Sequence, residues 1–171
     1  MSQASHSRPA SAHPAPAAYS PMQKRLHWAV VGVLILQYLA FDGMGRPFHQ
    51  GMEAGAMSYG FTPVAHIALG FAVLALAGWR LALRVRLGAP EAPAEEPALA
   101  RTASRWGHGA LYALLVALPV TGLIGWFGMS EDFAGVHEVL TNLLLAVAGL
   151  HVAAALVHQF WWKTDLMSRM R

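Results

Sequence analysis

The sequence predicts an all-α protein, a transmembrane four-helix bundle, on three observations. Of its 171 residues, 56% are hydrophobic and only 12% are charged, which is typical of a membrane protein rather than a soluble domain of this size. Four apolar stretches are each long enough to cross a hydrocarbon core, which takes about 20 helical residues. Because backbone groups inside such a core must bond within their own segment, we expect helices and not strands.

The predicted spans cover residues 22–41, 62–83, 108–127 and 136–162, all within a single membrane domain, 21–171. Residues 1–20 are rich in Ser, Ala and Pro and lack the apolar core of a signal peptide, so we expect a disordered tail. Between the spans we expect, in order, a Gly-rich loop, a Pro/Ala/Glu linker and a short turn, at residues 42–60, 88–100 and 128–135.

The basic residues predict how the bundle is oriented. Every Lys and Arg except Arg46 lies near the N-terminus, near the second linker or near the C-terminus. The positive-inside rule therefore places both termini in the cytoplasm and the 42–60 and 128–135 loops outside. The tryptophans fall near the span ends, as an aromatic belt requires; they are Trp28, Trp79, Trp106, Trp126, Trp161 and Trp162.

Histidine is the ionisable residue that the predicted spans carry. No Asp or Glu lies in the interior of a span, since Asp42 and Glu138 mark span ends. The absence of cysteine excludes disulfides, thiolate metal sites and cysteine-ligated iron–sulfur clusters. An ionisable group inside a membrane is a candidate functional residue, because its ring nitrogens need partners there. Six histidines lie in the spans or at their edges: His27, His66, His108, His137, His151 and His158.

Four of these histidines match in depth. His137 and His151 are 14 residues apart, which places them on one helix face, offset by about 40° and separated by about 21 Å along the axis. Sorted by depth, His151 pairs with His27 on the inner side and His137 with His66 on the outer side. Two facing imidazoles from two helices are the ligand set of a six-coordinate b-type haem, so the placement predicts two haems.

Other roles remain open for these residues at this point. A histidine in a membrane helix often forms an interhelical hydrogen bond, and a metal-ion transporter or a proton-conducting role is the further alternative. Transport of a hard divalent ion usually recruits carboxylates, which the spans lack. For His108 and His158 we expect either contact with a haem's surroundings or with quinone, or a structural hydrogen bond.

Four segments carry a family resemblance: YSPMQKRLHW, HIALGFAVLALAGWRLALR, HGALYALLVALPVTGL and HEVLTNLLLAVAGLHVAAALVHQFWWKTDLMSRM. They resemble the helices of bacterial cytochrome b561, a small quinone-linked dihaem cytochrome related to the cytochrome b subunits of Ni/Fe hydrogenases. The resemblance covers residues 19–171. It implies a multi-pass protein of the bacterial inner membrane, and bis-histidine haem b at the positions of His27, His66, His137 and His151.

The resemblance implies electron transfer across the membrane, linked to ubiquinone and the respiratory chain. In one hypothesis the protein acts alone, with superoxide as donor, which would make it a superoxide:ubiquinone oxidoreductase. The outer loops give no electrostatic support for attracting that anion, because they set Arg46 against Asp42, Glu53, Glu131 and Asp132. In the alternative it is a membrane anchor that passes electrons from a hydrogenase- or dehydrogenase-like redox partner to quinone. The expected partners are membrane lipid, ubiquinone and that partner protein, with no nucleic acid.

Overall fold

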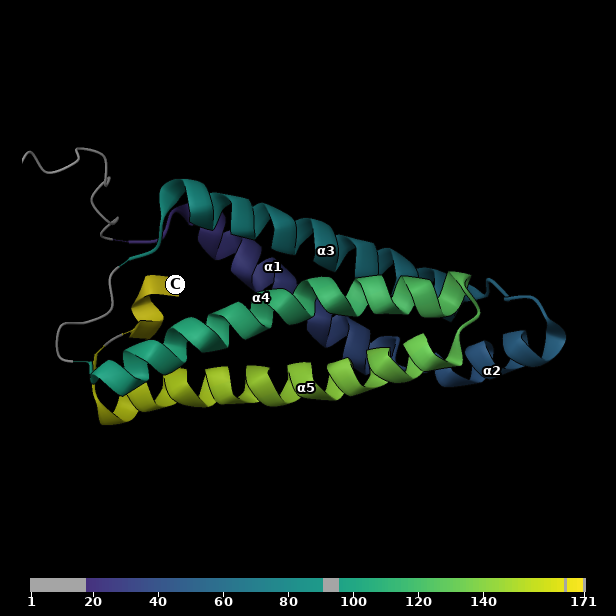
Figure 1. The fold of residues 1–171 in the computed structure, drawn as a ribbon. Helices are drawn as coiled ribbons and strands as arrows, with labels where there is room; N and C mark the ends of the chain where they lie inside the picture. Colours follow the sequence, from purple (N-terminus) through teal and green to yellow (C-terminus); the bar gives the residue numbers. More distant parts are fainter. Residues whose placement is uncertain (1–17, 91–95, 165, 171) are drawn as a thin grey trace, which may run out of the picture.

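The computed structural model describes residues 18–90, 96–164 and 166–170, and this part of the chain is helical without any strand (Figure 1). The predicted all-α bundle is thereby confirmed; the predicted tail lies almost wholly outside the described residues. The elements are α1 (Pro21–Ala40), α2 (Gly45–Ala54), α3 (Phe61–Leu87), α4 (Ala98–Phe127), α5 (Glu131–Leu156), a π-helical turn η1 (Val157–Trp161) and a 3₁₀ segment η2 (Leu166–Met170).

Three helices of the described chain are each long and apolar enough to cross a membrane: α3, α4 and the continuous helix Glu131–Trp161. The first helix, α1, meets the same condition only together with α2, from which it is bent by 65°. Lys24, Arg25 and His27 in the first two turns of α1 make it more polar than the others. The described chain thus has three helices suited to span a membrane, or four if α1 and α2 form one bent span.

The prediction of a loop over residues 42–60 is wrong for residues 45–54, which form α2. The less exposed face of α2 has residues at helical spacing, namely Phe48, Gly51 and Met52, and this face packs against the rest of the protein. Phe48 is buried and its ring lies 6.4 Å from that of Trp126 in α4, measured between centroids. The glycines that suggested a loop include Gly55, which ends the helix in the left-handed conformation (φ 69°).

Capping and helix propensity explain where the other helices begin. Ser20 and Gln23 form a reciprocal capping box at the start of α1. The side chain of Ser130 accepts from the backbone N–H of Phe133 at the start of α5, five residues before the predicted span. The fourth helix, α4, starts ten residues early because residues 98–107 contain mainly good helix formers, so the helix extends beyond its apolar part.

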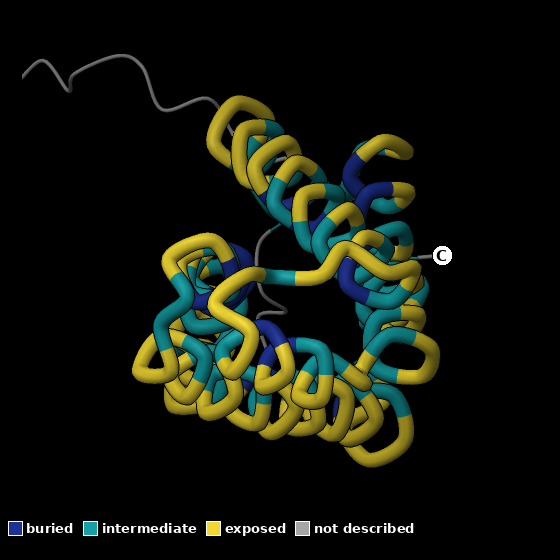
Figure 2. The backbone as a smooth tube through the Cα atoms, turned by 90° about the vertical axis from the view of Figure 1, so that its right-hand side faces the viewer, coloured by how far each residue is buried: buried dark blue, intermediate teal, exposed yellow. Residues whose placement is uncertain are grey.

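The helices pack as two pairs, α1 with α3 and α4 with α5, joined mainly by contacts of α3 with α4 (Figure 1). Two buried apolar clusters fill the middle of the bundle. Exposed positions lie on the outer sides of the helices (Figure 2), and they include Leu39, Phe61 and Leu150, each more than 70% exposed. An apolar outer surface of this kind suits contact with lipid.

The bundle has two distinct ends. At the first, which we call the basic end, lie the start of α1, the end of α3, the start of α4 and the C-terminal segments (left in Figure 1). Here η2 returns to α1, where Nε1 of Trp28 donates to the Met170 carbonyl (2.8 Å). At the other, which we call the α2 end, α2 lies near the turn between α4 and α5.

Candidate functional site

Two histidine pairs lie at two levels of the bundle, and they are the pairs that the depth argument selects. The rings of His27 (α1) and His151 (α5) lie 6.4 Å apart at the basic end, between centroids. The rings of His66 (α3) and His137 (α5) lie 6.1 Å apart at the α2 end. Both pairs have interplanar angles of 70°. A single helix, α5, therefore contributes one histidine to each level.

The separation within each pair fits an iron ion held between two imidazoles. A ring nitrogen binds a metal ion at about 2.0–2.1 Å and lies about 1.1 Å from its ring centre, so two rings on opposite sides of one ion have centroids about 6.3 Å apart. Within the described residues, no three or more His, Cys, Asp or Glu side chains are placed to hold a metal ion. A six-coordinate haem iron takes only two ligands from the protein. The four residues fit this role, which stays a prediction.

Backbone carbonyls orient both imidazoles at the α2 end. Nδ1 of His137 donates to the Leu118 carbonyl and Nδ1 of His66 donates to the Phe41 carbonyl, both at 2.9 Å. Because a carbonyl oxygen can only accept, each Nδ1 carries the hydrogen and each Nε2 keeps its lone pair for a metal. This is the arrangement by which a protein fixes the tautomer and direction of a ligating histidine.

Further hydrogen bonds fix the backbone beside these two histidines. Nε2 of Gln37 on α1 donates to the His66 carbonyl (3.1 Å). The neighbouring Tyr38 hydroxyl donates to the Thr141 carbonyl on α5 (2.8 Å), and the Thr141 hydroxyl donates to the His137 carbonyl (2.8 Å). Through these bonds α1 holds α3 and α5 at the same level.

Two glycines lie near the histidines at this level, and the space around them differs. A Cβ at Gly122 would lie 3.0 Å from Cε1 and Nδ1 of His137, so α4 approaches that ring closely. Gly70 follows His66 by one helical turn and is half-buried, yet a Cβ there would meet no atom within 4 Å. The chain thus leaves room beside His66 for a flat ring system.

The indole of Trp126 adds an observation that fits a haem at the α2 end. Its Nε1 is buried and has no hydrogen-bond partner within the described residues. Trp126 lies one turn beyond Gly122 on the same face of α4, toward the end of the bundle. The rings of Phe48 and Tyr59 lie 6.4 and 6.2 Å from it. A buried N–H without a partner is costly, and a haem propionate would be a strong acceptor.

At the basic end a third histidine joins the pair. The ring of His108 in α4 lies 5.2 Å from that of His151, between centroids. Nδ1 of His108 donates to the Ser104 carbonyl (2.7 Å), which leaves its Nε2 available. The separation is shorter than two rings sharing one ion require, so His108 lies beside the predicted ligand His151. The guanidinium of Arg80 lies within electrostatic reach of all three histidines at this end.

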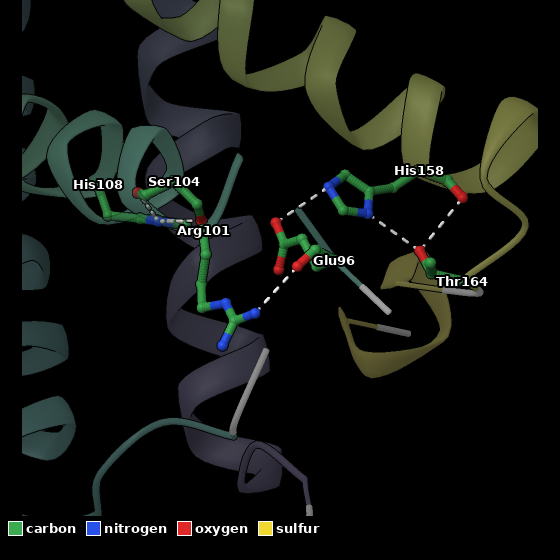
Figure 3. Close-up of polar contacts among 6 residues, drawn as sticks. All are labelled: Glu96, Arg101, Ser104, His108, His158 and Thr164. Carbon is green, nitrogen blue, oxygen red and sulfur yellow. Dashed lines mark hydrogen bonds and ion pairs between the residues drawn. The ribbon is translucent and has the colours of Figure 1, made fainter. Parts of the chain in front are cut away.

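The structure gives His158 different partners (Figure 3). It is buried in the π-helical turn, where its Nε2 lies 3.4 Å from the Glu96 carboxylate and its Nδ1 3.0 Å from the Thr164 hydroxyl. Among the described residues it makes no ring contact with the other five histidines, and its ring instead meets Trp162. Sequence reasoning missed Glu96, because an acidic residue in a Pro/Ala/Glu linker carries no signal of burial.

Comparison with known proteins supports the family that the sequence suggests. The family model described as prokaryotic cytochrome b561 matches residues 18–171. The chain belongs to this family. Its members are membrane electron-transfer proteins, and the family implies binding of b-type haem.

Three relatives align over most of this cytochrome. It is 30% identical to cytochrome b562 of Cereibacter sphaeroides, over 89% of this chain and 94% of that protein. It is 25% identical to the probable superoxide oxidase CybB of Yersinia pestis, with 89% and 94% covered, and 25% identical to cytochrome b561 homolog 1 of Escherichia coli K12, with 89% and 96% covered. The chain is therefore a bacterial multi-pass membrane cytochrome.

Proposed function

We propose that this cytochrome binds two haems b and carries electrons across the bacterial inner membrane to the ubiquinone pool. The observation that carries the proposal is the pair of matched ring separations, 6.4 and 6.1 Å, at two levels of one helix. His27 and His151 are the proposed ligands at the basic end, and His66 and His137 those at the α2 end. The 14-residue spacing on α5 puts the two levels about 21 Å apart along the helix.

The chain binds, orients and insulates the haems, whereas the bound haem iron supplies one-electron redox chemistry. At the α2 end the carbonyls of Phe41 and Leu118 hold the ligating imidazoles. Between the two levels, Val30 and Leu144 are buried among other aliphatic side chains. This apolar layer keeps water and ions from the path between the two sites.

Ubiquinone is proposed to react at the basic end, which the positive-inside rule places at the cytoplasmic face. His108 lies beside His151 with its Nε2 available, and it is the better candidate for contact with a haem's surroundings or with quinone. Both ring nitrogens of His158 already have protein partners, so a role for His158 there would pass through its bond with Glu96.

The donor is proposed to reach the α2 end from outside. A relative that aligns over nearly its full length is named a probable superoxide oxidase. The acidic balance of the outer loops around Arg46 does not favour an anionic donor. A redox-partner protein is the alternative donor. Quinone reduction by the isolated chain, reconstituted with ubiquinone and supplied with superoxide, distinguishes the two.

Spectroscopy of the purified protein tests the haem assignment. We expect a reduced b-type α-band and two haems per chain. His151→Ala and His137→Ala are each expected to lose one haem and keep the other, whereas His49→Ala, an exposed histidine on α2, should keep both. A protein without the α-band would refute the proposal, and two haems in His151→Ala would refute the proposed ligands.

A further inference from the structure

The two histidine levels differ in the charges around them. At the basic end, Arg80 on α3 lies within electrostatic reach of His27, His108 and His151, and Arg84 within reach of His108. Arg80 is half-buried, and its Nη1 donates to the Gln23 carbonyl (2.8 Å), which holds the guanidinium in place. The two arginines line one recess together with Tyr19, Gln23 and Tyr112.

The α2 end has the opposite charge. Asp42 is a carboxylate within electrostatic reach of His66. Glu138, the residue after His137 on α5, adds a second carboxylate at this end and is exposed. Arg46 lies at this end but is exposed on α2, so water and salt screen it. Asp42 is also exposed, and its effect is screened in the same way.

We infer that this asymmetry makes the haem held by His27 and His151 the one with the higher reduction potential, so that electrons run downhill from the α2 end to the basic end. The inference rests on the proposed function, because it needs both haems. It names Arg80 and Arg84 as the residues that set the direction. In the proposed orientation this direction is from the outer face to the cytoplasmic face, toward quinone.

The sign follows from electrostatics. Adding one electron makes a haem site more negative by one charge, so a nearby guanidinium stabilises the reduced state and a carboxylate destabilises it. The half-buried Arg80 acts through a medium of lower dielectric constant than the exposed Asp42 does. Arg80 should therefore contribute more to the difference than Asp42.

A potentiometric titration of the purified dihaem protein tests the inference, with both haems followed at the α-band. When the two haems share one electron, we expect that electron on the basic-end haem about ten times or more as often as on the other. This corresponds to reduction potentials that differ by about 59 mV or more for a one-electron couple. Arg80→Gln should lower the higher of the two potentials and leave the lower one in place. Arg80→Lys, which keeps the charge, should preserve both. Arg86→Gln, an exposed arginine on the same helix, is the matched control.

His137→Ala and His27→Ala assign the potentials, because the haem left in the first variant should titrate at the higher value. The inference is overturned if the two potentials are equal or in the reverse order. It is also overturned if Arg80→Gln shifts the lower potential, or shifts neither potential. Each of these results would leave the proposed function intact. A haem-to-protein ratio below two in the wild type would instead refute the proposed function, and this inference with it.

Discussion

The close approach of α4 to His137 gives a specific prediction for Gly122→Ala. A Cβ at this position would lie 3.0 Å from Cε1 and Nδ1 of His137, whereas ordinary van der Waals contacts of a Cβ begin at 3.4 Å. The imidazole must therefore retreat by about 0.4 Å, the difference between these distances. Any such shift disturbs the 2.9 Å bond from Nδ1 to the Leu118 carbonyl, which sets the direction of the ring.

The size of the effect follows from what that hydrogen bond does. Loss of an interaction that orients a metal-ligating histidine typically lowers metal affinity by 10–100-fold, about 1.4–2.7 kcal/mol. Alanine is the better helix former by about 1 kcal/mol, so the substitution does not weaken α4 itself. We expect Gly122→Ala to fold normally and to hold the α2-end haem 10–100-fold more weakly, with the other haem unaffected.

Haem transfer to excess apomyoglobin measures this directly, together with the haem-to-protein ratio after purification. Gly78→Ala is the matched control, because Gly78 lies in α3 and a Cβ there would meet nothing within 4 Å. Faster release of one haem from Gly122→Ala alone is the expected result. If Gly122→Ala keeps both haems with wild-type transfer rates, the argument from close packing against His137 is wrong.

Three further predictions follow from single contacts. Phe48→Ala should weaken the docking of α2 by about 3 kcal/mol and speed proteolysis within residues 45–54; unchanged proteolysis would contradict the packing on Trp126. Glu96→Ala should lower the free energy of unfolding by about 1–3 kcal/mol, because it leaves buried His158 without one partner. Glu96→Gln should lower this free energy less, and thermal unfolding in detergent measures both variants. Trp126→Phe keeps an aromatic side chain but removes the indole N–H, so the potential of the haem at the α2 end should fall in a redox titration; an unchanged potential would show that the N–H contacts no propionate.

The sequence was sufficient for the four long helices and for which of the four histidines lie side by side, whereas their role as haem ligands stays a prediction. Helical rise converts spacing into depth, and depth within a membrane-length helix leaves few ways to pair His27, His66, His137 and His151. The sequence was insufficient to predict α2. Glycines obscured its amphipathic pattern, which has only one large buried side chain, Phe48.

Contacts between segments distant in sequence could not be predicted from the sequence either. Glu96 meets His158 across 62 positions because a π-helical turn places that ring toward the linker before α4. A regular α-helix would have put His158 almost in line with His151, as the spacing of seven residues suggests. Neither a π-turn nor the burial of a linker carboxylate has a periodic signal in the sequence.

The position of both levels on α5 has a consequence for how the sites are held relative to each other. His137 and His151 belong to one uninterrupted helix, so the hydrogen bonds of that helix fix their separation. The opposing residues belong to two different helices: His27 to α1 and His66 to α3. Movement of α1 against α3 can therefore alter the geometry of one histidine pair without altering the distance between levels. In the proposed function α5 therefore fixes the distance between the two haem sites, whereas residues of other helices act on each site separately: Arg80 on α3 lies near His27 and His151, and Gly122 on α4 lies against His137.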